Sequence, residues 1–235
     1  LPLTVASFVE TVQSEGLSIP VTLVTESGTP AAAVAAGGPK PAAVTITTSD
    51  VTLVKYAGMA DATLEQIVST AGLLPAVQSV LGAGCLLAFE ADAITAIDGG
   101  AGQSATGTDW VGAITAGQAK ILGAGGVPAL AIVSALDYAA VMADLSAQAG
   151  FSHDPQSAIG SFMGSALHVS PKAPTGTAYV LDTAAVLSIE HKDSPMLLVD
   201  PFSQSSTNKT RIVGDMFAAT VVTNETLVCA VTVVP

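Results

Sequence analysis

The sequence predicts an α+β fold, in which strand-rich segments at both ends of the chain surround a long helix and a mixed helix–strand region. Three observations predict this fold. Two runs near the N-terminus, residues 18–25 and 44–54, are rich in β-branched residues. Apolar residues then recur at helical spacing from residue 61 to residue 96. After residue 107, helical and strand-like segments alternate, and β-branched residues return in the last third.

The first strand-rich segment is predicted to be a long hairpin. Residues 18–25 and 44–54 form its strands, and residues 26–42, rich in glycine, proline and alanine, form a wide, flexible tip. An isolated two-stranded hairpin is barely stable in water, so this one is expected to lean on its own domain or on a neighbouring subunit. Residues 1–17 are mildly apolar and lack a clear core pattern, which indicates an arm that lies over another element.

A single long helix is predicted next. Asp61 is expected to cap its N-terminus, and Pro75 either kinks it or marks the first turn of its second half. The apolar residues share one face and form the stripe Ile67, Ala71, Leu74, Val77, Leu81, Cys85 and Ala88. The uncharged run from Gln66 to Phe89 is long enough to span a bilayer. Because this run also contains polar residues and glycines, the stripe predicts a core helix and not a membrane span.

A mixed region follows the long helix. Residues 99–107 are rich in glycine and are predicted to be a flexible connector. The pair Thr108 and Asp109 is expected to cap a helix that ends at residue 121. A short buried strand over residues 130–133 and a helix over residues 135–148 complete the region.

The C-terminal third is predicted to be rich in strands. A loop over residues 150–164 leads into short strands at residues 166–170, 178–181 and 185–190. The last two strands, residues 218–222 and 227–234, are joined by the turn 223–226. They are predicted to form a hairpin in a sheet that packs on the long helix.

Charged residues are scarce, at 11% of the chain against about a quarter in an ordinary globular protein. Seven basic residues face nineteen acidic ones, which gives a net charge of −12. A compact monomer of this mass would expose about 9,700 Å², so its charges would be spread at about one per 370 Å². This low density of surface charge fits a self-associating protein, a secreted wall-type protein or a membrane protein. The acidic excess argues against a surface that binds a phosphate backbone.

No pattern of catalytic or metal-binding residues emerges from the sequence. His153, His168 and His191 lack the spacing of a metal site, and His168 lies in an apolar strand, where a structural histidine is expected. The glycine-containing segments match neither a nucleophile elbow, a dinucleotide-binding loop nor a P-loop. Cys85 and Cys229 are too few for a disulfide framework. The sequence therefore predicts a protein that is not an enzyme and binds no cofactor or metal.

The order of the predicted elements carries a resemblance. The local likeness is strongest at Gly164–Pro171 and Ala173–Asp182, where an apolar strand, a proline and a glycine turn precede another strand. Val127–Ala140 looks like a central strand and helix, and Lys40–Pro41 followed by residues 44–55 looks like the descending strand of an extended loop. Together these segments resemble the major capsid protein of tailed double-stranded DNA bacteriophages, which has the Hong Kong 97-type capsid fold.

The resemblance implies that the chain is divided into five parts. They are an N-terminal arm (1–17), an extended loop (18–55), a spine helix in the peripheral domain (56–98), an axial domain (99–189) and a β-rich return to the peripheral domain (190–235). The function implied is structural. Many copies of the chain would form the hexamers and pentamers of an icosahedral head that encloses DNA without sequence-specific binding.

Further partners and a location follow from the same resemblance. The partners implied are scaffold, maturation protease, portal and decoration proteins, and no membrane. The location implied is the virion capsid, assembled in the cytoplasm of the bacterial host. Family members often lose an N-terminal scaffolding segment to a protease, which would account for Leu1 at the start.

The resemblance also singles out the tip of the extended loop. Gly37, Gly38, Pro39 and Lys40 are expected to contact a neighbouring subunit. Some family members cross-link a loop lysine to an asparagine of a neighbour. The residues around Lys40, Asn208 and Asn224 do not match the pattern of that cross-link.

Two alternative functions stay open from the sequence. An encapsulin-type shell protein shares the fold and would be distinguished by a groove that binds a cargo peptide. A secreted bacterial surface or wall-associated β-rich protein would share the composition and would be distinguished by a leader peptide in the full gene product.

Overall fold

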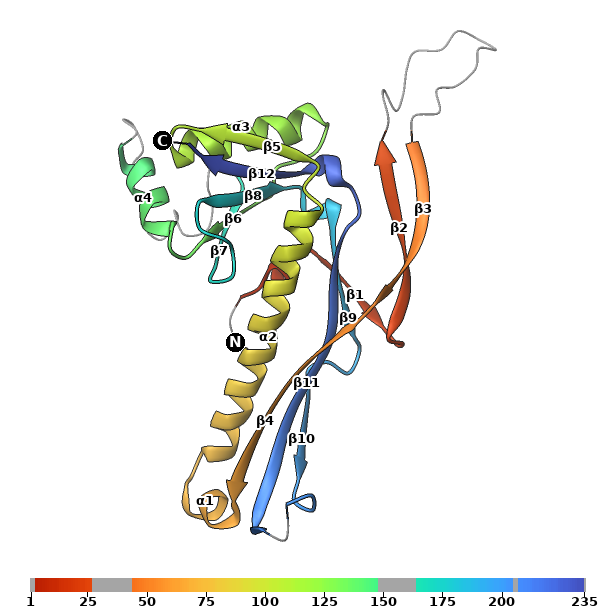
Figure 1. Ribbon diagram of the computed structural model, residues 1–235, viewed down its shortest axis with the longest axis vertical. Coiled ribbons are helices and arrows are strands. Elements are labelled where there is room, and N and C mark those ends of the chain that lie inside the picture. Colours follow the sequence, from red (N-terminus) through yellow and green to blue (C-terminus); the bar gives the residue numbers. More distant parts are fainter. Residues whose placement is uncertain (1–2, 27–43, 148–163, 205–206, 235) are drawn as a thin grey trace.

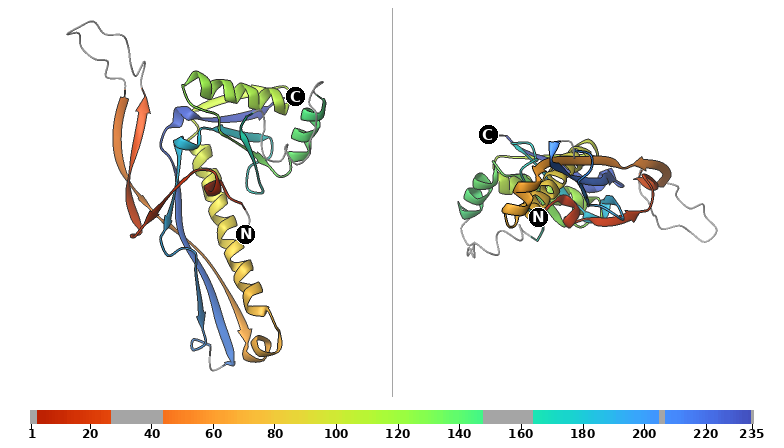
Figure 2. Two further views of the ribbon diagram at one scale, coloured as in Figure 1. Left: turned by 180° about the vertical axis from the view of Figure 1, so that it is seen from behind. Right: turned by 90° about the horizontal axis from the view of Figure 1, so that it is seen from below.

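The computed structural model describes residues 3–26, 44–147, 164–204 and 207–234. The molecule is elongated, with one sheet at its upper end, a second, longer sheet below it, and one helix that runs between them (Figure 1). A two-stranded hairpin stands to the side of this body in both Figure 1 and Figure 2. The expected α+β architecture is confirmed.

The lower sheet is organised around one long strand, β11 (Lys209–Val222). It pairs antiparallel with β4 (Val54–Thr63), with β10 (Met196–Asp200) and, near its C-terminal end, with β9 (Val186–His191). On its other edge β9 pairs in parallel with β1 (Glu10–Ser14). The N-terminal segment is therefore more than an overlying arm, because it contributes a strand that the sequence did not predict.

The upper sheet has the strand order β5-β12-β8-β6-β7. Its strands are β5 (Gln103–Gly107), β6 (Leu130–Ser134), β7 (Ala166–Ser170), β8 (Thr177–Leu181) and β12 (Val228–Val233). The helices α3 (Trp110–Gly123) and α4 (Tyr138–Ala147) share a hydrophobic core with one face of this sheet. Asp109 caps α3 by accepting a hydrogen bond from Gly112 N at 2.6 Å, as the sequence predicts. The predicted strand at residues 130–133 is also confirmed and is fully buried.

The long helix begins later than the sequence predicts. Asp61 lies in strand β4, and the segment up to residue 63 is extended because it pairs with β11 along its whole length. Thr63 caps a short helix, α1 (Leu64–Ser69), and the long helix α2 (Leu73–Gly99) starts after a turn. Pro75 lies in the first turn of α2, where its missing N–H has no helical partner to lose. The second of the two expectations for Pro75 is therefore the correct one.

Helix α2 belongs to two cores. Its middle packs on the lower sheet, where Cys85 and Phe89 join Tyr56 and Met216. Its C-terminal part packs under the upper sheet, where Ala93, Ile94 and Ile97 join a cluster that includes Tyr179. The predicted stripe is correct only from Leu74 to Cys85. Ile67 lies in α1 and Ala71 is exposed in the turn before α2, and Ala88 is exposed because the buried face continues through Phe89.

The length and composition of α2 would allow it to cross a membrane. The same property is found in core helices of soluble proteins. Here the helix buries Cys85, Phe89 and Ile97 against strands of its own chain. The contacts are those of a core helix.

Two further sequence predictions are wrong. Residues 103–107 form strand β5 instead of a flexible connector, and their small side chains serve close packing. A Cβ on Gly107 would lie 2.3 Å from the backbone nitrogen of Ala113 in α3. The predicted C-terminal hairpin is also wrong, because β11 and β12 lie in different sheets. The chain crosses between them at residues 223–227, where Thr223 N donates to the carbonyl of Ala185 at 2.8 Å.

The predicted N-terminal hairpin is confirmed for its described strands. Strands β2 (Ser18–Glu26) and β3 (Val44–Thr52) pair antiparallel from Ser18 opposite Thr52 to Glu26 opposite Val44. The base of the hairpin packs on the body, where Val21 and Leu53 form a small core with Ile189 and Ala219 of the lower sheet.

Two glycines allow a matched test of this packing. Gly84 lies within α2 with nothing within 4 Å of an added Cβ, whereas the added Cβ at Gly107 meets backbone. Gly84→Ala is expected to raise the free energy of unfolding by about 0.5–1 kcal/mol, because alanine restricts the unfolded chain and favours the helix. Gly107→Ala is expected to lower it by about 1–3 kcal/mol through overpacking. Urea unfolding of the unassembled chain measures both, and equal shifts would contradict the packing of β5 under α3.

Candidate functional site

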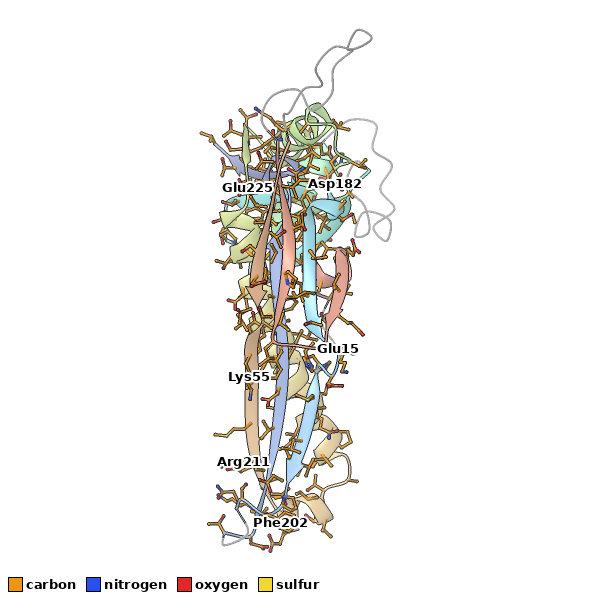
Figure 3. All side chains as sticks on the ribbon, turned by 90° about the vertical axis from the view of Figure 1, so that its right-hand side faces the viewer. Glu15, Lys55, Asp182, Phe202, Arg211 and Glu225 are labelled. Atoms are coloured by element: carbon orange, nitrogen blue, oxygen red, sulfur yellow. The ribbon has the colours of Figure 1, made fainter. Side chains whose placement is uncertain are left out.

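Below the hairpin base, the described residues leave one face of the lower sheet uncovered. Alternate residues of β4 and β11 point to α2 and are buried or half-buried, and the residues between them point the other way. On this second face, Met59, Val213 and Leu198 lie directly opposite one another in three neighbouring strands. Met59 is 66% exposed and Leu198 is 63% exposed. We call this surface the open face; Figure 3 shows the side of the molecule on which it lies.

Ion pairs flank the apolar row of the open face on both sides. On one side Lys55 Nζ lies 2.8 Å from Asp215 Oδ2. On the other side the guanidinium of Arg211 donates to both oxygens of Asp61, at 2.9 and 3.1 Å. These hydrogen bonds hold the pKa of Asp61 below its usual value. The open face thus presents an apolar centre between two ion pairs, in each of which the opposite charges offset one another.

Exposed apolar side chains continue to the lower end of the molecule. Strand β10 is an edge strand in which Leu197 is 43% exposed, and Phe202, just beyond it, is 81% exposed. Figure 3 shows Phe202 at the lower tip, below Arg211. Val68 in α1 and Val80 in α2 are also exposed. An apolar edge strand attracts other chains, so this end is suited to contact with a partner.

The predicted loop-tip residues Gly37, Gly38, Pro39 and Lys40 lie outside the described residues. The strands that carry this tip are described. Residues 45–50 of β3 are all exposed, among them Ile46 at 69%. The hairpin therefore extends an apolar side chain into solvent well away from its anchored base.

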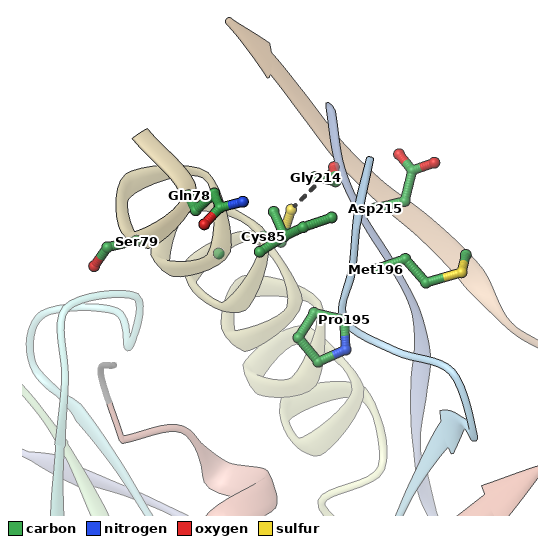
Figure 4. A pocket seen from close by; sticks show the side chains of 9 residues that line it. Gln78, Ser79, Cys85, Pro195, Met196, Gly214 and Asp215 are labelled. Carbon is green, nitrogen blue, oxygen red and sulfur yellow. Dashed lines mark hydrogen bonds between the residues drawn. The ribbon is translucent and has the colours of Figure 1, made fainter. Parts of the chain in front are cut away.

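An apolar cavity of about 280 Å³ lies between α2 and the strands β10 and β11 (Figure 4). Gly82 and Cys85 line it from the helix, and Pro195, Leu197 and Gly214 line it from the strands. The thiol of Cys85 donates to the carbonyl of Gly214 at 3.6 Å. Gln78, Ser79 and Asp215 also line the cavity. Asp215 is paired with Lys55, and its charge raises the pKa of the Cys85 thiol, so the acid does not activate that thiol.

Neither cysteine has the surroundings of a reactive thiol. Cys85 and Cys229 are both free and buried. Burial raises the pKa of the Cys85 thiol, and the charge of Asp215 adds to this effect. Burial also raises the pKa of Cys229. Among the described residues, no three histidines, cysteines or acids come together in a way that could hold a metal ion.

The histidines have separate surroundings. His168 is 4% exposed and its Nε2 lies 2.7 Å from Glu90 Oε1, which agrees with the expected structural role. His191 lies at the end of β9 beside a turn, where its Nδ1 accepts from Asp193 N at 3.3 Å. His153 lies outside the described residues. The sequence did not single out Glu90, because an acid in a largely apolar helix carries no signal of its buried partners.

The two asparagines considered for cross-linking both bond within the chain. Asn208 adopts a positive φ of 55° at the lower tip, and its Nδ2 donates to Glu65 Oε1 at 2.6 Å. Asn224 caps the turn between the two sheets by accepting from Thr226 N at 3.1 Å.

Comparison with known families gives one match. A family model described as phage capsid protein matches residues 45–230. No curated protein matches the chain.

The fold is similar to those of many solved chains. A chain from Mycobacterium phage Adephagia has 16% identity and a TM-score of 0.73, with 98% of this chain and 90% of that chain covered. A chain from Microbacterium phage Oxtober96 has 11% identity and a TM-score of 0.75, with coverage of 100% and 93%. A virus-like particle from Pyrococcus furiosus has 9% identity and a TM-score of 0.68, with coverage of 97% and 91%. At these identities the likeness concerns the fold.

The surroundings of the two thiols lead to a labelling prediction. Because the thiolate is the reactive form and both cysteines are buried, each is expected to react with a disulfide reagent at least about a hundredfold more slowly in the folded chain than in urea. Absorbance of the released thiolate measures the rate. Rapid labelling of either cysteine in the folded chain would show an accessible thiol and contradict its burial.

Proposed function

Because the chain belongs to the phage capsid protein family, we propose that its copies form the hexamers and pentamers of an icosahedral phage head around double-stranded DNA. The protein is a structural component of a capsid shell. The family match favours this function over an encapsulin-type shell or a wall-associated protein. The observation that carries the proposed assembly is the open face, which leaves an apolar row uncovered on an otherwise packed sheet.

We propose that a neighbouring copy covers the open face. Apolar burial contributes roughly 25 cal/mol per Å² before the costs of association are subtracted, so each contact stays modest. A closed shell repeats each contact many times, and many modest contacts give a stable particle in which single errors can still dissociate. The ion pairs Lys55–Asp215 and Arg211–Asp61 would set the register of the contact, since their side chains are already oriented.

We propose that the chain divides as the resemblance implies, into an arm (1–17), an extended loop (18–55), a spine helix (56–98), an axial domain (99–189) and a peripheral return (190–235). The upper sheet with α3 and α4 corresponds to the axial part, and the lower sheet with α2 to the peripheral part. Strand pairing departs from these bounds at two places, because β12 lies in the upper sheet and β9 lies in the lower sheet. The loop tip at Gly37, Gly38, Pro39 and Lys40 is proposed to contact a neighbouring subunit.

We propose that the protein has further protein partners in the head and catalyses no reaction. Scaffold, maturation protease, portal and decoration proteins are the expected protein partners, with assembly in the bacterial cytoplasm and no membrane involved. Packaged DNA would touch the shell without sequence-specific binding. The net charge of −12 supports this, because an acidic shell repels the phosphate backbone.

The loop proposal is tested by deleting residues 30–41. The deletion lies beyond the described pairing of β2 with β3, so the chain is expected to fold while shell formation is impaired. Size-exclusion chromatography followed by negative-stain microscopy measures hollow particles, and circular dichroism measures folding. If the deleted chain does not fold, the assignment of this segment to contacts between subunits is wrong.

The open face is tested by a pair of substitutions at Leu198. Leu198→Asp is expected to leave the free energy of unfolding of the unassembled chain within about 0.5 kcal/mol, because the side chain is exposed. It is expected to abolish particle formation, because a charge would be buried between subunits. Leu198→Met keeps an apolar side chain and should assemble like the unaltered chain. Normal particle yield from Leu198→Asp would rule out the open face as a contact.

A further inference from the structure

A buried carboxylate joins three segments that are far apart in the chain. Glu90 of α2 is 1% exposed. Its Oε1 lies 2.7 Å from Nε2 of His168 in strand β7, and its Oε2 accepts from the backbone N–H of Val5 at 2.7 Å. Both oxygens are thus engaged by donors from other elements. Neither donor belongs to the helix that carries the acid.

The N-terminal segment is held by this contact together with apolar packing and strand pairing. Val5 is fully buried and shares a core with the end of α2 and the upper sheet. Phe8 stacks at a tilt on His168, with ring centroids 5.2 Å apart. Beyond them, Glu10–Ser14 pairs as β1 with the lower sheet. The segment therefore spans from one sheet to the other, and Glu90 holds its first turn.

The carboxylate is charged at neutral pH. Burial raises the pKa of Glu90, but the hydrogen bonds from His168, Val5 and Ser170 lower it, and the net pKa lies below the ordinary 4.5. Among the described residues, the charge that acts on Glu90 is that of His168. The other charged groups on the packed elements are turned elsewhere: Asp92 bonds Tyr56, Asp98 bonds Tyr179, and Glu10 and Lys172 are exposed.

We propose that Glu90 is a proton-operated latch, which fixes the N-terminal segment across the two sheets when ionised and releases it when protonated. A proton from solvent binds one carboxylate oxygen, and no covalent bond to carbon changes. The protonated oxygen of Glu90 then carries a hydrogen that faces the N–H group it previously accepted from. The backbone N–H of Val5 cannot act as an acceptor, and His168 Nε2 cannot accept while it carries its own proton.

The direction of the pH effect follows from the lowered pKa. The latch stabilises the bound segment fully above the ordinary carboxyl pKa of 4.5. This effect is lost progressively as the pH falls from there through the lowered pKa of Glu90. The release is local, because α2 and the upper sheet keep their remaining apolar contacts. The inference concerns the single chain and does not depend on the proposed assembly.

Hydrogen exchange of the full chain, corrected for the intrinsic rate at each pH, tests the latch. The amides of residues 5–8 are expected to exchange about tenfold faster or more once the pH falls below the pKa of Glu90, while those of β6 and β8 stay protected. Glu90→Gln should show the faster exchange already at neutral pH, since its amide N–H₂ faces a donor, and acid should add little. Asp92→Asn, a matched loss of charge on the same helix, should behave like the unaltered chain.

Three results would overturn the proposal. One is exchange at residues 5–8 that does not change with pH in the unaltered chain. Another is simultaneous loss of protection in β6 and β8, which would mean that acid unfolds the whole upper sheet. The third is a folded Glu90→Gln with the exchange of the unaltered chain. If Glu90→Gln does not fold, the pH titration of the unaltered chain decides alone.

Discussion

The whole structure depends on one helix that has to serve two sheets. Every fourth residue of α2 from Leu81 to Ile97 faces inward, and the partner changes from the lower sheet to the upper one along the way. Helix α2 lies close to the lower sheet at Gly58 and Gly214. An added Cβ on these two glycines would lie 3.1 and 3.2 Å from the side chain of Leu81. Without these two glycines, the helix would stand further from β4 and β11. The relative position of the two sheets then follows from a rigid rod of 27 residues.

The elongated shape of the chain gives the shortage of charged residues a structural meaning. The chain exposes 12184 Å², about a quarter more than a compact monomer of its mass would. A helix can cover one face of the lower sheet, but the described chain has no second layer for the other face below the hairpin base. The sequence has too few charged residues to coat so extended a body. We propose that copies of the chain meet on that surface.

Several elements could be predicted from the sequence because their signals are local. The hairpin strands alternate β-branched residues, and Asp109 caps α3 with its own side chain. The signals failed where small residues dominate. Strand β4 contains alanine, glycine and methionine, and the sequence predicts that a helix begins near its end, at Asp61. Only the pairing with β11 makes this segment extended. The change of sheet after Val222 and the partners of Glu90 depend on contacts between distant segments, which no local pattern records.

The junction between β3 and β4 has a mechanical consequence. A single residue, Leu53, separates the end of the hairpin strand from the start of the long strand, and the two form one continuous curve in Figure 1. Extended chain has almost no slack along its axis, so a pull on the hairpin is transmitted as tension directly into β4. From there, ten paired positions share the load with β11 in shear, the direction in which a ladder of hydrogen bonds resists most stiffly. The hairpin and the lower sheet are therefore mechanically connected through Leu53.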